Sequence, residues 1–312
     1  MTDIINIIYI FLIIFRKKIY LYKLYFQFIT GIYNSTAAFL DALFFTCNIK
    51  PYEAIAPSKP QRKHVGNKTV TTKNPWIHRV FPGCPTFDCA QWKCLSRRGI
   101  AAKVIRHELI ETVAPRLTAK GAIVLYLVRD PRGIFSSRLK IHGGRSNPGA
   151  FLHKESIMKN QKALVQMQCN NIARNVQYIK DCTTCIQPNC AGNVIVLRYE
   201  DFAHNPYTMS EKLYEYLNIP MPQNVTTYIE RSTNVVKGVG IKGRPDPYGT
   251  KRNSEATAEN WRTYLPFEYV EVIQNICGQL LTDLGYEHVN LNSLKRMNET
   301  VVTAMSNDLP HL

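Results

Sequence analysis

The chain has 312 residues, 45% of them hydrophobic, which is enough for one substantial core and excludes a collagen-like, repetitive or wholly disordered protein. Lysine and arginine outnumber aspartate and glutamate by 39 to 23, giving a formal net charge of +16. This charge favours anionic partners such as nucleotides, nucleic acids, acidic glycans or membrane head groups, but it also fits a solvated basic surface without a dedicated ligand.

The apolar run Ile4–Phe15 begins the chain. It is shorter than the roughly twenty residues of a membrane span, and its basic flank, Arg16–Lys18, follows it. By the positive-inside rule this order would hold the rest of the chain in the cytosol. Two interpretations of residues 1–18 stay open: an atypical membrane anchor, or translated intron or misassembled sequence.

Strands and helices are predicted to alternate along the rest of the chain. Short apolar runs predict buried strands at Ile100–Ile105, Gly121–Val128 and Asn193–Leu197. Apolar spacing predicts helices over Glu108–Leu117, Glu155–Lys180, Ser210–Leu217 and Phe267–Leu284. Ser210 is expected as an N-cap and Gly285 as a left-handed C-cap. Residues 51–95 show no sustained period and predict a long surface excursion pinned by cysteines.

This alternation predicts an α/β fold with a central parallel sheet flanked by helices. In such folds, ligands bind at the carboxyl ends of the strands.

Cysteines and glycosylation sequons indicate an oxidising compartment. Nine cysteines are present, and only Cys182 and Cys185 have the two-residue gap that zinc sites use, so disulfides are the expected use of the thiols. The pairing is not fixed by the sequence, and the odd number leaves at least one thiol outside intrachain pairs. Four sequons begin at Asn34, Asn67, Asn224 and Asn298.

The most specific pattern begins where the second predicted strand ends. Arg129 follows Val128, Asp130 can cap the next helix, and Pro131 suits the first helical turn. A guanidinium beside a helix N-terminus is a natural anion site. In the alternative interpretation, Arg129 only pairs with Asp130 or another nearby carboxylate.

Gly133 and Ser137 lie four residues apart on the predicted helix and share a face. A phosphate could therefore approach over the glycine and accept a hydrogen bond from the serine hydroxyl. Arg129 would hold the same phosphate from the other side.

Three motifs in order resemble the sulfotransferase family, and most closely its membrane-bound Golgi members, the galactose and N-acetylglucosamine 6-O-sulfotransferases of the keratan sulfate type. They are Leu127-Val-Arg-Asp-Pro-Arg132 with Ser137-Arg138, Leu197-Arg-Tyr-Glu-Asp-Phe202 with Asn205-Pro206, and the run Tyr248–Arg262. The resemblance implies a P-loop-like sulfotransferase fold over residues 19–290, lacking its first strand, loop and helix, followed by a C-terminal tail at 291–312.

The resemblance also implies a donor and a set of site residues. The donor is 3′-phosphoadenosine 5′-phosphosulfate (PAPS), with Arg129 and Ser137 on its 3′-phosphate and Tyr199 near its adenine. Arg252, Asn253 and Ser254 would close over the nucleotide. No metal is expected, because side chains and backbone amides compensate the charge in this family, and no catalytic residue is assigned.

The implied activity is transfer of sulfate to the 6-hydroxyl of galactose or N-acetylglucosamine in glycans or proteoglycans, by a Golgi membrane protein with a lumenal catalytic domain. The family's Arg-x-Gly-Ser-Ser-type phosphosulfate loop has only Thr30-Gly31 as a faint candidate here, and Lys23 stands where the family carries a glutamate. A catalytically impaired glycan- or nucleotide-binding relative is therefore an alternative. A nucleic-acid binder would need a recognition motif that the sequence does not show.

The segment Lys237–Arg252, which ends inside the third motif, is interpreted as a mobile lid. Glycines supply hinges and basic residues supply charge that attracts anions. The glycines are Gly238, Gly240, Gly243 and Gly249, and the basic residues are Lys237, Lys242, Arg244, Lys251 and Arg252. A solvated basic loop is the alternative.

Overall fold

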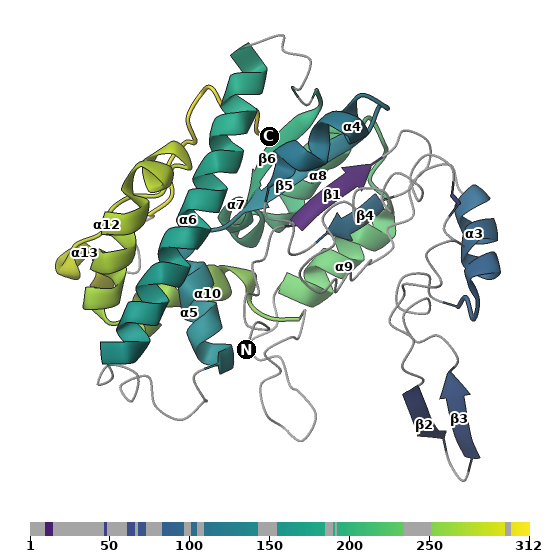
Figure 1. Cartoon of the computed structure of the whole chain (residues 1–312), viewed down its shortest axis with the longest axis horizontal. Coiled ribbons are helices and arrows are strands. Elements are labelled where there is room, and N and C mark those ends of the chain that lie inside the picture. Colours follow the sequence, from purple (N-terminus) through teal and green to yellow (C-terminus); the bar gives the residue numbers. More distant parts are fainter. Residues whose placement is uncertain are drawn as a thin grey trace. The chain divides into compact units, whose positions relative to one another are not determined.

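The computed structural model describes residues 10–14, 47–48, 61–65, 68–72, 83–96, 101–104, 109–142, 155–184, 190, 192–233, 251–296 and 301–312 (Figure 1). The chain forms two compact units. One consists of Met1–Tyr126 with Cys185–Ile195, and the other of Leu127–Thr184 with Val196–Leu312. The division passes through β5 (Ile123–Val128) and β6 (Val194–Arg198).

The main sheet has four strands, in the hydrogen-bonded order β4 (Ala101–Val104), β1 (Ile10–Ile14), β5 and β6. Strands β1 and β4 pair antiparallel, with Phe11 opposite Val104. Strand β6 is buried along its whole length and β5 along nearly all of it, which explains their continuous apolar sequences. Helices alternate with these strands along the chain, so the predicted α/β class is confirmed, but the antiparallel pair of β1 and β4 departs from the predicted parallel sheet.

The prediction of a long surface excursion without sustained period over residues 51–95 is wrong in part, whereas its pinning by cysteines is confirmed by two disulfides. Strands β2 (Gln61–Val65) and β3 (Lys68–Thr72) form an antiparallel pair there, and α3 (Phe87–Leu95) follows. The side chain of Thr86 caps α3 by accepting a hydrogen bond from the backbone N–H of Cys89 at 3.2 Å. The irregular interpretation failed because these elements are short and polar on most faces.

The predicted helix over Glu108–Leu117 is interrupted. A 3-10 turn, η3 (Ile110–Thr112), precedes a short α4 (Ala114–Thr118) that has Pro115 in its first turn. A proline inside a continuous helix would lack its backbone hydrogen bond and clash with the carbonyl four residues earlier. The helix therefore starts afresh just before the proline.

Helices make up most of the second unit, and the two longest, α6 (Glu155–Thr184) and α12 (Phe267–Asp283), run beside each other (Figure 1). The others are α5 (Pro131–His142), α7 (Tyr199–His204), α8 (Pro206–Tyr216), α9 (Gln223–Thr233), α10 (Ser254–Glu259), α11 (Trp261–Tyr264) and α13 (Leu291–Lys295). The long helices bury the apolar faces that their periodicity predicted, including Ile172 and Val176 of α6 and Val270 and Ile273 of α12.

Two predicted helix ends have different outcomes. Gly285 has a φ of +68°, and a side chain there would meet the Thr303 and Ala304 carbonyls, so the predicted left-handed glycine is confirmed. The N-cap at Ser210 is wrong, because α8 begins at Pro206. Proline's fixed φ suits the first helical position, and Ser210 donates its hydroxyl hydrogen to the Pro206 carbonyl at 2.6 Å.

The last residues of the chain pack into the second unit. Val301, Met305 and Leu309 are buried. The guanidinium of Arg198 donates to the carbonyls of Leu284 at 2.9 Å and Thr303 at 2.7 Å. The end of β6 is therefore tied to residues about one hundred positions later.

Disulfides use most of the described cysteines, as predicted. Cys47–Cys94 and Cys84–Cys89 lie in the first unit, and Cys169–Cys277 joins α6 to α12 in the second. Cys182 and Cys190 belong to none of these pairs. No group of His, Cys, Asp and Glu that could hold a metal ion occurs within the described ranges.

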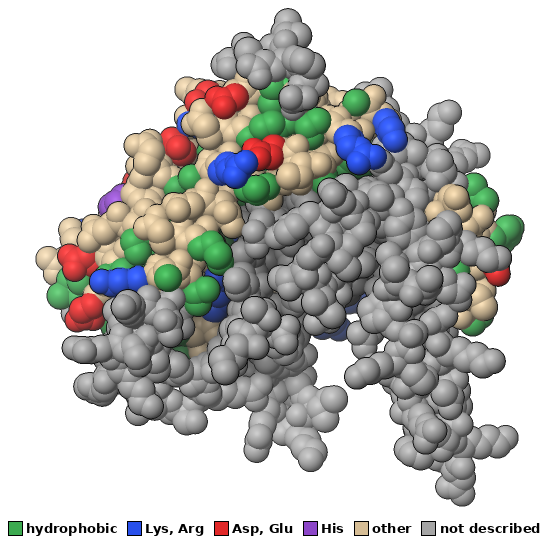
Figure 2. Space-filling view, viewed as in Figure 1, with side chains coloured by type: hydrophobic (Ala, Val, Ile, Leu, Met, Phe, Trp, Pro, Cys, Tyr) green, Lys and Arg blue, Asp and Glu red, His purple; other side chains and the backbone are tan. Residues whose placement is uncertain are grey.

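The described part of the surface carries both charged and hydrophobic side chains (Figure 2). On the face that Figure 2 shows, coloured acidic and basic side chains are interspersed with hydrophobic ones. Among the helices that the structure describes, none has the length and apolar character to cross a membrane.

Replacing both Cys169 and Cys277 by alanine should lower the free energy of unfolding by about 3–5 kcal/mol, because the cross-link closes a long loop and restricts the unfolded chain. Urea unfolding without reductant measures the change. Cys190→Ala, which removes a thiol outside these disulfides, is the control and should shift the midpoint far less. Equal midpoints for the double variant and the unchanged protein would contradict the prediction.

Candidate functional site

Arg129 leaves the carboxyl end of β5 and lies along the start of α5. Its Nη1 donates to the Ser137 hydroxyl at 3.3 Å, and its Nη2 donates to the Thr257 carbonyl at 3.4 Å. The guanidinium lies over the Tyr199 ring, with Cζ 4.5 Å from the ring centroid, an arrangement that favours the cation. The pair that the first motif suggested, Arg129 and Ser137, therefore meets in the structure, and Tyr199 of the second motif joins it.

Gly133 makes room for this arginine. A Cβ at Gly133 would lie 3.3 Å from Arg129 Nε and 3.5 Å from Trp261 Cδ1. Any larger side chain would press on the guanidinium, so glycine allows Arg129 to lie close against α5.

A pocket of about 150 Å³ opens beside Arg129. It is lined by Arg129, Gly133, Ser136, Ser137, Arg252, Thr257, Asn260 and Trp261. None of these eight residues is acidic and two are arginines, so the pocket suits an anion. Arg129 Nε is buried next to this pocket and has no hydrogen-bond partner among the described residues.

Helix α10 brings the third motif to the pocket. Arg252, just before it, lines the pocket, and its backbone N–H donates to the Ser232 carbonyl at 3.0 Å. Asn253 caps α10 by accepting from the Ala256 N–H at 2.8 Å, and Ser254 donates its hydroxyl hydrogen to the Ala203 carbonyl at 2.6 Å. The side chains of Asn253 and Ser254 thus fix α10 in place, and they are not among the pocket-lining residues.

A histidine and a glutamate also join α7 to α10. His204 Nε2 lies 3.3 Å from Glu259 Oε1. The hydrogen bond to Glu259 raises the pKa of His204, and burial offsets only part of that effect. The ion pair with Glu259 thus favours the charged imidazolium, which helps to hold the two helices together.

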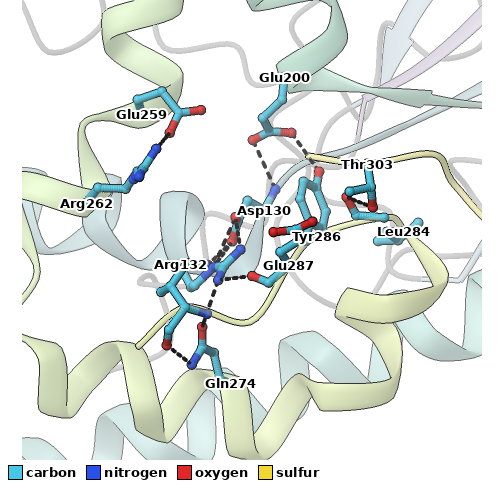
Figure 3. A network of polar contacts seen from close by, with 12 residues as sticks. Asp130, Arg132, Glu200, Glu259, Arg262, Gln274, Leu284, Tyr286, Glu287 and Thr303 are labelled. Atoms are coloured by element: carbon cyan, nitrogen blue, oxygen red, sulfur yellow. Dashed lines mark hydrogen bonds and ion pairs between the residues drawn. The ribbon is translucent and has the colours of Figure 1, made fainter. Parts of the chain in front are cut away.

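A buried ion pair fixes the turn that aims Arg129 (Figure 3). Asp130 Oδ1 accepts from the Arg132 N–H at 2.8 Å, and its Oδ2 lies 2.7 Å from Arg132 Nη2. Asp130 is therefore both the predicted helix cap and the ion-pair partner of Arg132.

Arg132 is fully buried and extends this network. Its Nη1 donates to Gln274 Oε1 at 2.8 Å and to the Glu287 carbonyl at 2.7 Å. Its guanidinium lies over Trp261, with Cζ 4.3 Å from the ring centroid. Arg132 thus connects the start of α5 to α12 and to the wall of the pocket.

Glu200 is a buried carboxyl behind the site. Its Oε1 accepts from the Asp130 N–H at 3.2 Å, and the Tyr286 hydroxyl donates to its Oε2 at 2.6 Å (Figure 3). Burial, followed by the negative charge of Asp130, raises the pKa of Glu200 to about 7. Glu200 therefore changes its charge near neutral pH.

Comparison with known proteins identifies the protein family. The model of the sulfotransferase domain matches residues 61–285, well over half of the chain. The chain belongs to the sulfotransferase family.

Several curated sulfotransferases are similar in sequence. Carbohydrate sulfotransferase 1 of Mus musculus is 33% identical over 207 residues, covering 63% of this chain and 47% of the mouse protein. Carbohydrate sulfotransferase 1 of Danio rerio is 32% identical over 220 residues, covering 67% and 49%. Carbohydrate sulfotransferase 2 of Homo sapiens is 27% identical over 258 residues, covering 72% and 47%.

The sulfotransferase chain spans about half the length of the curated relatives it matches. No solved structure matches it. The family expectation from the three motifs is thus confirmed, while the roles of individual site residues stay predictions.

Among the predicted site residues of this sulfotransferase, Arg129, Ser137, Tyr199 and Arg252 come together, and Asn253 and Ser254 lie next to them in α10. The lid glycines Gly238, Gly240, Gly243 and Gly249, the basic residues Lys237, Lys242 and Arg244, and the N-terminal positions Lys23, Thr30 and Gly31 lie outside the described residues.

Sequence reasoning missed four pocket residues: Ser136, Thr257, Asn260 and Trp261. Ser136 had a usable signal, because it lies three residues after Gly133 and one before Ser137 on the same helix. The other three lie within the third motif, Tyr248–Arg262, which was the available signal, but the fold brings them to α5 from more than one hundred residues away in sequence.

Replacing Glu200 by glutamine should flatten the pH dependence of stability. The pKa of this carboxyl is about 7 in the folded protein against an ordinary 4.5, so the folded state binds the proton more tightly. The free energy of unfolding should then fall as pH rises from 4.5 to 7, by roughly 3 kcal/mol, and level off above.

Urea unfolding at pH 5 and pH 7.5 tests this difference. Glu200→Gln should lose less stability between the two pH values than the unchanged protein, whereas Glu215→Gln, on the exposed side of α8, should behave like the unchanged protein. Parallel losses in all three proteins would refute the assignment.

Proposed function

We propose that this chain is a PAPS-dependent carbohydrate sulfotransferase that transfers sulfate to the 6-hydroxyl of galactose or N-acetylglucosamine in glycans or proteoglycans. One observation carries the proposal. Arg129 is stacked on Tyr199 and bonded to Ser137 beside a pocket without acidic residues, at the carboxyl end of a buried strand. This is where α/β folds bind nucleotides.

The pocket fits one phosphate group of the donor. Its volume of about 150 Å³ is below the roughly 300–1,000 Å³ of sites that enclose a whole drug-sized ligand, so the rest of the nucleotide would lie outside it. The buried Arg129 Nε needs an acceptor, and phosphate oxygens supply one. We assign the pocket to the 3′-phosphate.

The residues of this chain would hold the nucleotide at several points. Arg129 and Ser137 bind the 3′-phosphate, Arg252 faces the same anion, and Tyr199 lies near the adenine. Asn253 and Ser254 keep α10, and with it Arg252, over the nucleotide. These contacts fix the donor's position and leave its sulfuryl group directed at the acceptor.

Sulfate transfer would proceed by in-line displacement at sulfur. The acceptor's 6-hydroxyl oxygen bonds to sulfur as the bond from sulfur to the 5′-phosphate oxygen breaks, and a base takes the hydroxyl proton. Adenosine 3′,5′-bisphosphate leaves with the electron pair of that bond. No described residue is assigned as the base, and metal ions are not required in this scheme.

The cellular setting belongs to the same proposal. Three disulfides within the described ranges are stable in an oxidising lumen, as in the Golgi, where membrane-bound enzymes with lumenal domains meet their glycan acceptors. We also propose the P-loop-like version of the α/β fold for residues 19–290, with keratan-type chains as the acceptor class.

A catalytically impaired, nucleotide- or glycan-binding relative is the second candidate. The observation that favours it is the sequence itself, in which Thr30-Gly31 is the sole faint counterpart of the family's phosphosulfate loop and Lys23 replaces a glutamate. Such a protein would bind adenosine 3′,5′-bisphosphate through Arg129 and Ser137 without turnover.

Arg129→Ala should weaken binding of adenosine 3′,5′-bisphosphate by tenfold to one hundredfold, roughly the worth of hydrogen bonds between charged groups. Isothermal titration calorimetry measures the Kd. Arg174→Ala, on the exposed part of α6, is the matched control and should leave the Kd unchanged. Equal affinities in all three proteins would show that the nucleotide does not bind in this pocket.

Transfer of labelled sulfate from PAPS separates the two candidates. An active enzyme should label keratan-type acceptors with free 6-hydroxyls and not acceptors already sulfated there, and Arg129→Ala should lose most of this activity. Binding of the bisphosphate without transfer to any glycan acceptor would support the impaired relative instead.

A further inference from the structure

One face of α5 fronts the anion pocket. Gly133, Ser136 and Ser137 lie at positions i, i+3 and i+4, which share a helix face, and all three line the pocket. Ser137 is already paired with Arg129. Ser136 is 3% exposed, and its hydroxyl has no hydrogen-bond partner among the described residues.

An unpaired hydroxyl is unusual for a serine inside a helix. Such a serine commonly donates to the carbonyl four residues earlier, as Ser210 does to Pro206 at 2.6 Å and Thr233 does to Ile229 at 2.8 Å in this chain. Ser136 does not. A buried hydroxyl without a partner costs about 1–3 kcal/mol, so a ligand that supplies the partner would be stabilised by it.

A second buried donor at this pocket also needs an acceptor. Arg129 Nε is also buried, is also without a partner in the described part of the chain, and lies at the same pocket. Both groups can donate a hydrogen, and a guanidinium N–H can only donate. Two unpaired donors at a wall without acidic residues call for a ligand rich in acceptors.

We propose that Ser136 is a further ligand of the bound anion, donating its hydroxyl hydrogen to the phosphate group that Arg129 and Ser137 also hold. This rests on the proposed function, and it assigns a site residue that neither the motifs nor the pairing of Arg129 with Ser137 includes. A terminal phosphate has three oxygens that each accept hydrogen bonds, so Arg129 Nε, Ser136 and Ser137 can bind it together.

The proposal predicts that Ser136→Ala weakens nucleotide binding without lowering the stability of the nucleotide-free protein. Without nucleotide the variant should be as stable as the unchanged protein or more so, because it loses an unpaired buried hydroxyl. With adenosine 3′,5′-bisphosphate its Kd should rise about tenfold, since a hydrogen bond to a charged group is lost. A purely structural serine would give the reverse: lower stability and an unchanged Kd.

Ser232→Ala is the matched control. Ser232 is 6% exposed, its hydroxyl is likewise unpaired among the described residues, and it does not line the pocket. The substitution keeps the backbone carbonyl that accepts from Arg252. It should change stability in the same direction as Ser136→Ala and leave the nucleotide affinity as it was.

The experiment combines urea unfolding with calorimetric titration of adenosine 3′,5′-bisphosphate and adenosine 5′-monophosphate against the unchanged chain, Ser136→Ala, Ser232→Ala and Arg129→Ala. We expect Ser136→Ala to weaken the bisphosphate about tenfold and to change the monophosphate little, because the latter lacks the 3′-phosphate.

The other outcomes overturn the proposal in distinguishable ways. If Arg129→Ala weakens the bisphosphate but Ser136→Ala does not, the proposed function stands and Ser136 is not a ligand. An equal loss for both nucleotides in Ser136→Ala would detach the hydroxyl from the 3′-phosphate, and lower stability without nucleotide would make the residue structural. No bisphosphate binding by the unchanged chain would overturn both proposals.

Discussion

The ion pair between Asp130 and Arg132 is the constraint on which the site depends. Both side chains are almost fully buried, and removing one partner of such a pair leaves an uncompensated charge, which commonly costs about 3–5 kcal/mol. The pair fixes the turn between β5 and α5, and Arg129 immediately precedes it. With Arg132 also bonded to Gln274 and to the Glu287 carbonyl, the start of α5 cannot move without disturbing α12.

Next to this rigid turn, buried hydrogen-bond donors lack acceptors in the described part of the chain. Two nitrogens of Arg129 donate long hydrogen bonds, to Ser137 at 3.3 Å and to Thr257 at 3.4 Å. Its Nε has no partner in the described part of the chain. The stacking of Arg129 on Tyr199 holds the guanidinium's orientation while leaving its edge available. A site built this way gains from binding an anion, and membership in the sulfotransferase family gives that anion a chemical identity to test.

Much of the fold was readable in advance because its elements are long or strongly patterned. The apolar runs of β5 and β6 and the periodicity of α6 and α12 identified the main strands and helices. Pro131 marked the start of α5, and Gly285 marked the end of α12. The errors fall where local signals compete. Pro206 rather than Ser210 starts α8, Pro115 divides a predicted helix, and the pair β2 and β3 was missed although Gly66-Asn67 separates two strand-length runs, a common hairpin signal.

The sequence by itself determined the family, the α/β class and the pairing of Arg129 with Ser137, because strand end, cap, proline and glycine all act within ten residues of one another. The third motif already supplied Arg252, but only the tertiary structure decided which other residues of that motif complete the pocket. Thr257, Asn260 and Trp261 reach it through the packing of α10 and α11 on α7 and α5, and such packing depends on shape and burial across more than one hundred residues. The same holds for the charge state of Glu200, which burial against Asp130 and Tyr286 sets and no local pattern reveals.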